Sequence, residues 1–279
     1  MRVAICGLGL IGGSFARAYK KHGHTVLGFD TNKNTMNYAL ENGICDSELK
    51  TNDLKQCDLL IVAICPEAAI RYIEEIAPHI GSRCTVIDIC GTKQKITETV
   101  FPLAKKHGFR FCGTHPMAGL HFSGIEYSRA ELFEGASMVL VPPHDADMAF
   151  TDHVTELLAP AGFGRFTVCD AKEHDRMIAY TSQLAHVVSN AYVKSPTAKM
   201  HHGFSAGSYK DLTRVAKLDE NMWTELFLQN SEHLSKELDF IIAALTQYKT
   251  AIDSNDADTL RGLLREGRII KEETDGYGL

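Results

Sequence analysis

The stretch CGLGLIGGS, residues 6–14, constrains the fold of this chain more than any other part of the sequence. It follows an apolar run, RVAIC at 2–6, and opens a segment with helical spacing. In the pattern G-x-G-x-x-G the first glycine permits a tight turn, the second lets the backbone approach a pyrophosphate, and the third lets the helix pack on the strand. The anion then binds unpaired N–H groups at the start of the helix. The residues expected to contact such a nucleotide are Gly7, Gly9, Leu10, Ile11 and Gly12.

Short runs rich in β-branched residues alternate with helical patterns over the first 170 residues. The runs are RVAIC (2–6), TVLGFD (25–30), LLIVAIC (59–65), TVIDIC (85–90), FRFCG (109–113), SMVLVP (137–142) and RFTVCD (165–170). Near-continuous apolar strands separated by helices are typical of a parallel sheet that is covered on both faces. We therefore predict an α/β fold whose N-terminal domain, residues 1–170, is a Rossmann-type doubly wound, mostly parallel sheet.

The pattern changes after Asp170, because no further strand is predicted and apolar residues recur at three- and four-residue spacing. This predicts an all-α C-terminal domain over residues 171–279. The apolar face of its central segment is wider than a small helical domain needs, which favours a subunit interface. That face is formed by Trp223, Leu226, Phe227, Leu234, Leu238, Ile241, Ile242, Leu245 and Tyr248.

Composition excludes several classes of protein. The chain has 279 residues, 44% apolar and 23% charged, with a net charge of −6 that opposes binding to nucleic acid or to an anionic membrane. Its longest apolar run, at 59–65, is too short to cross a bilayer, and glycines interrupt the apolar N-terminus, unlike a signal peptide. The eight cysteines contain no Cys-x-x-Cys, so no metal site is predicted. Free thiols in a reducing compartment predict a cytoplasmic protein.

Asp30 ends the second predicted strand, 18 residues after Gly12, near the spacing expected for an acid that binds a ribose. Its charge would repel a 2′-phosphate, so the sequence favours NAD over NADP as the cofactor. Lys33 is a counterargument, since a cation there could pair with that phosphate. The alternative role for Asp30 is to cap the next helix.

Two further candidates lie at predicted strand ends, where open sheets of this kind bind ligands. His115 stands at the tip of a strand, followed by a proline, and histidine can accept a proton near neutral pH. Thr92 begins a predicted helix, so it is either a site residue or an N-cap.

The first helix of the predicted C-terminal domain carries a polar stripe. At about 100° per residue, spacings of seven and four place Asp175, Ser182 and His186 on one face. Such a stripe, if buried, is either hydrogen-bonded within the core or functional. Downstream, Arg214 is a candidate cation, and its alternative role is an ion pair with Asp211 three residues earlier.

Several motifs occur in a fixed order along almost the whole chain. They are GxGxxGGS at 7–14, DxxGTK at 88–93, HPMAG at 115–119, SG at 123–124, LFEGA at 132–136, HD at 174–175, SxxxH at 182–186, and DxxR at 211–214 with Trp223 nine residues on. This ordered set resembles the prephenate dehydrogenase (cyclohexadienyl/arogenate dehydrogenase) family. The resemblance implies NAD-dependent oxidative decarboxylation of a small molecule, prephenate, to 4-hydroxyphenylpyruvate in tyrosine biosynthesis.

The resemblance also implies roles for individual residues. His115 accepts the proton of the ring 4-hydroxyl while hydride leaves C4, Thr92 hydrogen-bonds that hydroxyl next to the cofactor, and Arg214 binds a substrate carboxylate. Members of the family form homodimers through the helical domain, which also binds substrate. The remaining residues implied at the site are His186, as a catalytic residue that lines the pocket, and Ser182, Asp175, Trp223 and Asp211, as substrate-binding residues.

One departure from the family pattern bears on the base. Where the family commonly has Thr-Glu-Lys after Ala-Gly, this chain has Leu120, His121 and Phe122. Without that acidic group, His115 is expected to lose its proton at lower pH.

Three alternatives to this prediction remain open. The substrate is either prephenate or its amino counterpart arogenate. A related two-domain β-hydroxyacid or imine dehydrogenase would rely on a group such as lysine in the first interdomain helix, where this chain offers Lys172 only at the start. A non-catalytic dinucleotide-binding regulator would leave His115, Thr92 and Arg214 without a function.

Overall fold

The computed structural model describes residues 1–120 and 122–275. Its internal contacts define two compact units, residues 1–230 and 231–279. The domain boundary at residue 170 stays a prediction. His121, where the sequence predicts a missing acid, lies outside the described residues.

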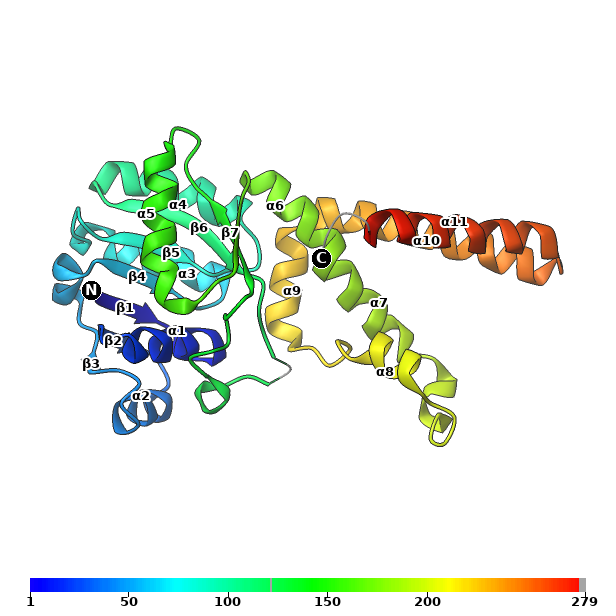
Figure 1. Ribbon diagram of the computed structural model, residues 1–279, viewed down its shortest axis with the longest axis horizontal. Helices are drawn as coiled ribbons and strands as arrows, with labels where there is room; N and C mark the ends of the chain where they lie inside the picture. Colours follow the sequence, from blue (N-terminus) through cyan, green and yellow to red (C-terminus); the bar gives the residue numbers. More distant parts are fainter. Residues whose placement is uncertain (121, 276–279) are drawn as a thin grey trace. The chain divides into compact units, whose positions relative to one another are not determined.

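An eight-stranded sheet forms the centre of the first unit (Figure 1). Its order is β3-β2-β1-β4-β5-β6-β7-β8, and all neighbours are parallel except the antiparallel pair β6–β7. The predicted Rossmann-type, mostly parallel sheet is therefore confirmed. The strands are β1 (Arg2–Cys6), β2 (Thr25–Phe29), β3 (Ser47–Glu48), β4 (Leu59–Val62), β5 (Thr85–Asp88), β6 (Arg110–Pro116), β7 (Ser137–Val141) and β8 (Arg165–Val168). Only β3, at the sheet edge, was not predicted.

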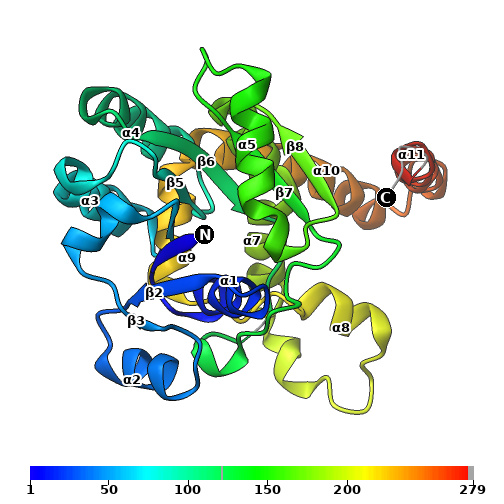
Figure 2. The same ribbon diagram turned by 60° about the vertical axis from the view of Figure 1, so that its left-hand side comes forward.

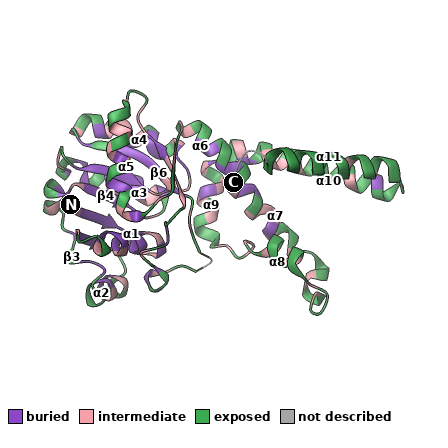
Figure 3. Cartoon of the chain, viewed as in Figure 1, coloured by how far each residue is buried: buried purple, intermediate pink, exposed green. Residues whose placement is uncertain are grey.

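Helices cover both faces of this sheet. Successive strand residues point to opposite sides, so the apolar strands present a hydrophobic surface on each face. Val3 and Ile5 of β1 pack in one core with α1 and α5, whereas Ala4 packs in the other core with α3 and α4. Figure 2 shows these helices around the strands, and Figure 3 shows that the strands are largely buried. The helices are α1 (Leu10–Lys21), α2 (Lys33–Glu41), α3 (Pro66–Ile76), α4 (Gln94–His107) and α5 (Met148–Leu158). Short 3₁₀ turns lie at Thr51–Gln56, Ala77–His79, Ile125–Tyr127, Ala159–Ala161 and Pro196–Met200.

The strand order reverses between β1 and β4. The chain runs from β1 outward to β2 and β3, then returns to the other side of β1 to form β4 and β5. Ligands of doubly wound sheets bind beyond the carboxyl ends of the strands at such a switch point. The glycine-rich turn follows β1 at this position.

The rest of the first unit is helical. It contains α6 (Ala171–Ile178), a π-helical turn (Ala179–Leu184), α7 (Ala185–Tyr192), α8 (Gly207–Thr213) and α9 (Glu220–Gln229). Asp170 caps α6 by accepting a hydrogen bond from the backbone of Glu173. As predicted, no strand occurs among residues 171–275, the described part of the chain after Asp170.

The second unit is a hairpin of α10 (Ser231–Asp253) and α11 (Ala257–Asp275). Within it, the hydroxyl of Tyr248 donates to the carbonyl of Leu263 at 3.2 Å. No described helix, over residues 1–120 and 122–275, is both long and apolar enough to span a membrane.

The glycine-rich turn depends on close backbone contacts. Gly7 adopts a φ of +88°, a conformation that favours glycine, and a Cβ on Gly12 would lie 1.8 Å from the carbonyl oxygen of Gly7. Gly9 differs, since a Cβ there would meet no heavy atom within 4 Å. The turn therefore needs Gly12 for packing, while Gly9 faces open space.

We predict that Gly12→Ala lowers the free energy of unfolding by about 1–3 kcal/mol, because the added methyl group forces the turn and α1 apart. The matched variant Gly9→Ala should change that free energy by no more than about 0.5 kcal/mol. Urea unfolding followed by circular dichroism measures both. Equal losses in the two variants would show that the turn does not pack as described.

Candidate active site

The start of α1 is built to receive an anion. Gly9 is the N-cap residue and provides no side-chain cap, so the first N–H groups of the helix have no side-chain acceptor at this end. The open space beside Gly9 lets a ligand approach the backbone there. A pyrophosphate fits these groups, because the helix dipole adds positive potential at this end.

Asp30, which follows β2, stabilises this turn through hydrogen bonds. Its carboxylate accepts hydrogen bonds from the backbone N–H of Leu8 and of Asn32, both at 2.8 Å. The alternative role as a helix cap is wrong, because α2 is capped by Asn32, whose side chain accepts from Asn34 and Thr35. Each carboxylate oxygen of Asp30 retains a lone pair for a ribose hydroxyl.

A cavity of about 440 Å³ lies beside Asp30, at the carboxyl ends of β1, β2 and β4. The ring of Tyr72 in its wall stacks on Phe29 with centroids 6.2 Å apart. Arg71 also lines the cavity, whereas Lys33, the cation considered from the sequence, does not. Residues that line it include Gly7, Asp30, Thr31, Ile64, Arg71 and Tyr72. The glycine-rich turn, this cavity and the carboxylate together fit the adenosine and pyrophosphate portions of a dinucleotide.

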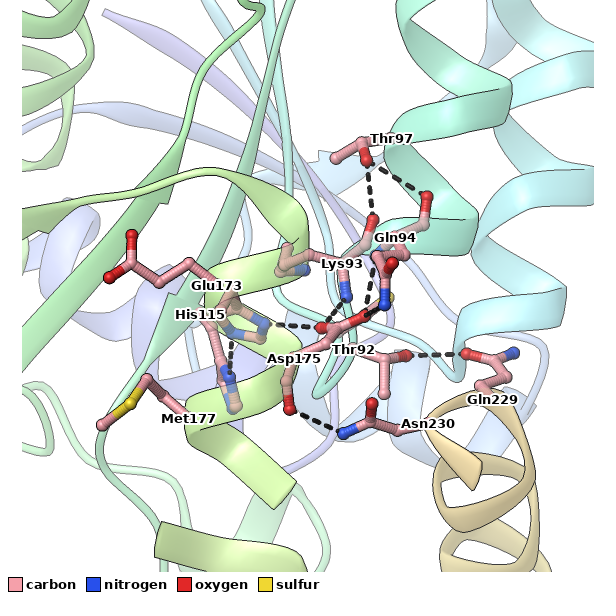
Figure 4. A network of polar contacts seen from close by, with 12 residues as sticks. Thr92, Lys93, Gln94, Thr97, His115, Glu173, Asp175, Met177, Gln229 and Asn230 are labelled. Atoms are coloured by element: carbon pink, nitrogen blue, oxygen red, sulfur yellow. Dashed lines mark hydrogen bonds and ion pairs between the residues drawn. The ribbon is translucent and has the colours of Figure 1, made fainter. Parts of the chain in front are cut away.

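His115 lies near the end of β6 (Figure 4), and its ring contacts a second histidine, His174. Its Nδ1 is 3.0 Å from Nε2 of His174, and Nδ1 of His174 is 2.7 Å from a carboxylate oxygen of Asp175. His174 and Asp175 are buried, while His115 is half-buried. Three side chains from β6 and α6 thus form one hydrogen-bonded chain.

Asp175 also joins α6 to the start of α4. It accepts hydrogen bonds from the backbone N–H of Lys93 at 2.7 Å and of Gln94 at 3.0 Å, and from the side chain of Gln94 at 3.2 Å. α4 has no cap from its own N-cap residue, so a carboxylate from another helix serves as the cap. The contact fixes the histidine chain to the carboxyl edge of the sheet.

A fully buried ion pair, Lys93 with Asp88, lies near the two histidines. The ammonium group of Lys93 pairs with Asp88 at the end of β5, and Asp88 also accepts hydrogen bonds from the backbone of Cys90 and Thr114. Thr114 precedes His115 in β6. The pair therefore places a positive charge close to both histidines.

Burial and this charge set the protonation of the two histidines. Burial, followed by the charges of His174 and Lys93, holds the pKa of His115 well below its usual value of 6.5. Burial also lowers the pKa of His174, although Asp175 acts in the opposite direction. Burial alone would raise the pKa of Asp175, but hydrogen bonds from His174 and from backbone amides lower it. At neutral pH both histidines are neutral and Asp175 is ionised.

Thr92 is held by α9. Its hydroxyl donates to the side-chain oxygen of Gln229 at 2.7 Å, and the residue is 2% exposed. Thr92 is not the N-cap of α4, the alternative that the sequence left open. Its hydroxyl oxygen can still accept a hydrogen bond.

His186 of α7, Trp223 of α9 and Arg214 at the C-cap of α8 form a separate group, while Ser182 lies in the preceding π-helical turn. The ring of His186 packs on Trp223 with centroids 4.0 Å apart, and its Nδ1 is 2.8 Å from the carbonyl of Ser182. Burial lowers the pKa of His186, and the nearby positive charge of Arg214 lowers it further. Arg214 and Asp211 are exposed, and the ion pairs of the described residues do not join them to each other.

The π-helical turn changes the predicted polar stripe. A π turn holds more residues than an α turn, so the face presented after it shifts by about one residue. Gln183, rather than Ser182, is buried beside Asn230, whose side chain bridges Gln183 and the carbonyl of Asp175 at 2.8 Å each. The predicted single face from Asp175 through His186 is therefore wrong in its geometry.

Sequence reasoning assigned no role to several members of the network. His174 was noted only as part of a motif, and Lys93 only as the end of another. A charged residue that ends an apolar strand, as Asp88 does, was the available signal for the buried pair. The unassigned members are Asp88, Lys93, His174, Gln183, Gln229 and Asn230.

The fold and the site define a class. A doubly wound sheet, a glycine-rich turn at its switch point and a histidine pair at the same carboxyl edge identify a dinucleotide-binding dehydrogenase. Residues 15–166 match the nucleotide-binding domain of prephenate dehydrogenase, and residues 170–266 match its dimerization domain. The chain belongs to the prephenate dehydrogenase family.

Individual relatives agree with this membership. The chain is 29% identical to the prephenate dehydrogenase of Bacillus subtilis, over 99% of this chain and 76% of that protein. It is 30% identical to that of Lactococcus lactis, over 97% of this chain and 77% of that protein. Among solved structures, it superposes with a TM-score of 0.81 and 28% identity on prephenate dehydrogenase from A. aeolicus in complex with hydroxyphenyl propionate and NAD+, covering 99% of this chain and 98% of that one.

Proposed function

We propose that this chain catalyses the NAD-dependent oxidative decarboxylation of prephenate to 4-hydroxyphenylpyruvate, a reaction of tyrosine biosynthesis. The observation that carries the proposal is the position of His115 at the carboxyl edge of a dinucleotide-binding sheet, where its ring contacts His174 and His174 contacts Asp175. Relatives named prephenate dehydrogenase that align over almost the whole chain support the substrate.

The cofactor is NAD. The glycine-rich turn would hold its pyrophosphate, through Gly7, Gly9, Leu10, Ile11 and Gly12, and Asp30 would bind the adenosine ribose. A carboxylate at that position disfavours a 2′-phosphate. When bound, NAD supplies the hydride acceptor.

His115 acts as the general base in this proposal. Its neutral ring accepts the proton of the substrate's 4-hydroxyl as C4 loses hydride and becomes a carbonyl carbon. Electrons of the bond to the departing carboxylate then enter the ring, carbon dioxide leaves, and the carbonyl oxygen becomes a phenolate that takes the proton back from His115 to give the phenol. Thr92 would donate to the oxygen of the same hydroxyl, which requires its O–H to turn from Gln229 toward the substrate.

The group on α7 to α9 would bind the substrate's polar ends. Arg214 is a cation that can grip a carboxylate in a bidentate manner, and His186 beside it is neutral. Ser182, Trp223 and Asp211 stay predicted members of this part of the site. Asp175, which the sequence also predicts to bind substrate, is buried on α6 against the start of α4 and His174. A positive Arg214 opposes the side-chain ammonium of arogenate, so we favour prephenate.

The proposal predicts NADH formation with prephenate, and a lower kcat/KM with arogenate measured in parallel. Replacing the base, in His115→Asn, should lower kcat by about 10²–10⁴-fold with little change in NAD affinity. NADH absorbance and released carbon dioxide are measured in the same reactions. No turnover of prephenate by the wild-type protein, or higher kcat/KM with arogenate, would refute the proposed substrate.

We also propose that the protein is a homodimer formed through its C-terminal helices. The chain matches a dimerization domain over residues 170–266. In the second unit, Ile242, Leu245 and Ile252 are each more than half exposed and recur on one face of α10. An apolar stripe of this kind on a two-helix hairpin favours burial against another chain.

The dimer proposal predicts a mass of about twice the monomer's 30.8 kDa in sedimentation at micromolar concentration. Leu245→Glu should shift the protein toward monomer, because it places a charge in the apolar stripe. As a matched control, Met148→Glu alters a residue that is 82% exposed on α5 and should leave the mass unchanged. A monomeric wild-type protein would contradict the proposal.

A cytoplasmic location is part of the proposal. All eight cysteines are free thiols, and six of them are buried. Such thiols persist in a reducing compartment.

A further inference from the structure

We propose that His174 and Asp175 are positioning residues that hold His115 in the neutral tautomer whose Nε2 is free to accept a proton. The inference rests on the proposed role of His115 as the base. The inference concerns which of the two ring nitrogens of His115 carries the hydrogen. That choice is set by the hydrogen bond that the ring makes with its neighbour.

Asp175 determines which atoms donate and which accept along the hydrogen bonds from Asp175 through His174 to His115. Its ionised carboxylate can only accept hydrogen bonds, and it is surrounded by donors from Lys93, Gln94 and His174. Nδ1 of His174, at 2.7 Å from the carboxylate, must therefore carry a hydrogen. No other arrangement leaves this buried contact with one donor and one acceptor.

The next link follows from the charge of His174. Lys93 lies close by, paired with Asp88, and burial also opposes a second proton on His174. A neutral His174 with its hydrogen on Nδ1 has a bare Nε2. That atom is 3.0 Å from Nδ1 of His115, so Nδ1 of His115 is the donor.

The last link concerns His115 itself. Because its hydrogen lies on Nδ1, its Nε2 is unprotonated, and this is the atom that can take the substrate's proton. The reverse tautomers would place a hydrogen on Nε2 and block the base. In a Ser-His-Asp triad, a carboxylate fixes the tautomer of the catalytic histidine in a similar way. Replacing that carboxylate by an amide lowers kcat by about 10⁴-fold.

Nitrogen NMR of the protein with isotope-labelled histidine rings, in the presence of NAD, tests this directly. The wild-type spectrum should show His115 with hydrogen on Nδ1 and a bare Nε2, the signals being assigned by their loss in His115→Asn. His174→Gln keeps a polar group beside His115 but breaks the contact with Asp175, so the Nε2–H tautomer should become populated. Asp175→Asn should have the same effect when its NH₂ group faces His174, because His174 and Gln94 donate to different carboxylate oxygens and an amide has an oxygen on one side only.

The same variants are assayed with prephenate. His174→Gln should lower kcat at least tenfold, with the KM for NAD unchanged, because the population of the competent tautomer falls. Gln94→Ala is the control, since it removes one side-chain donor to Asp175 and leaves His174 in place. It should preserve both the tautomer and kcat.

Hydrogen on Nε2 of wild-type His115, or an unchanged tautomer and kcat in His174→Gln, would overturn the inference. The NMR measurement does not depend on turnover. A wild-type protein that fails to oxidise prephenate but shows the predicted tautomer would refute the proposed function and leave the positioning chain standing.

Discussion

The carboxylate of Asp175 is the interaction on which the site depends. It is buried, and it accepts hydrogen bonds from two backbone amides at the start of α4, from the side chain of Gln94 and from His174. A buried charge is stable only when it is paired or hydrogen-bonded, so loss of these donors costs several kcal/mol. The same group therefore caps a helix that covers the sheet and orients the histidine chain.

The buried ammonium group of Lys93 complements the carboxylate of Asp175. Lys93 donates its backbone N–H to Asp175 while its ammonium group pairs with Asp88, so one residue connects both carboxylates. Its positive charge lowers the pKa of both His115 and His174. The result is a neutral imidazole chain next to an ionised carboxylate, which suits a general base that must be free of its proton at neutral pH.

Local sequence patterns predicted the sheet and the nucleotide turn, because both are specified by residues that are close together in the sequence. Near-continuous apolar runs predict buried strands, and the spacing of Gly7, Gly9 and Gly12 predicts a turn that brings Gly12 against the backbone of Gly7. β3 was missed because two residues carry no periodicity. The His115 position was also predicted from its place at a strand tip, and its role stays a proposal.

The connections within the site could not be read from local patterns. α4 is capped by Asp175, about 80 residues later in the chain, which local capping rules do not predict. The π-helical turn moves Gln183 into the place that α-helical spacing gives to Ser182. Asp30 was open to two roles from spacing alone, and the cap of α2 proved to be Asn32. Each of these outcomes depends on tertiary contacts rather than on composition.

Asp175 holds the start of α4 through the backbone amides of Lys93 and Gln94, and hydrogen exchange at these two amides tests this most directly. In Asp175→Ala both amides should exchange about tenfold faster or more, since each loses a charge-assisted hydrogen bond, while amides of β5 keep their protection. His174→Gln should leave both amides protected, because it does not touch the cap. Unchanged exchange at Lys93 and Gln94 in Asp175→Ala would contradict the account.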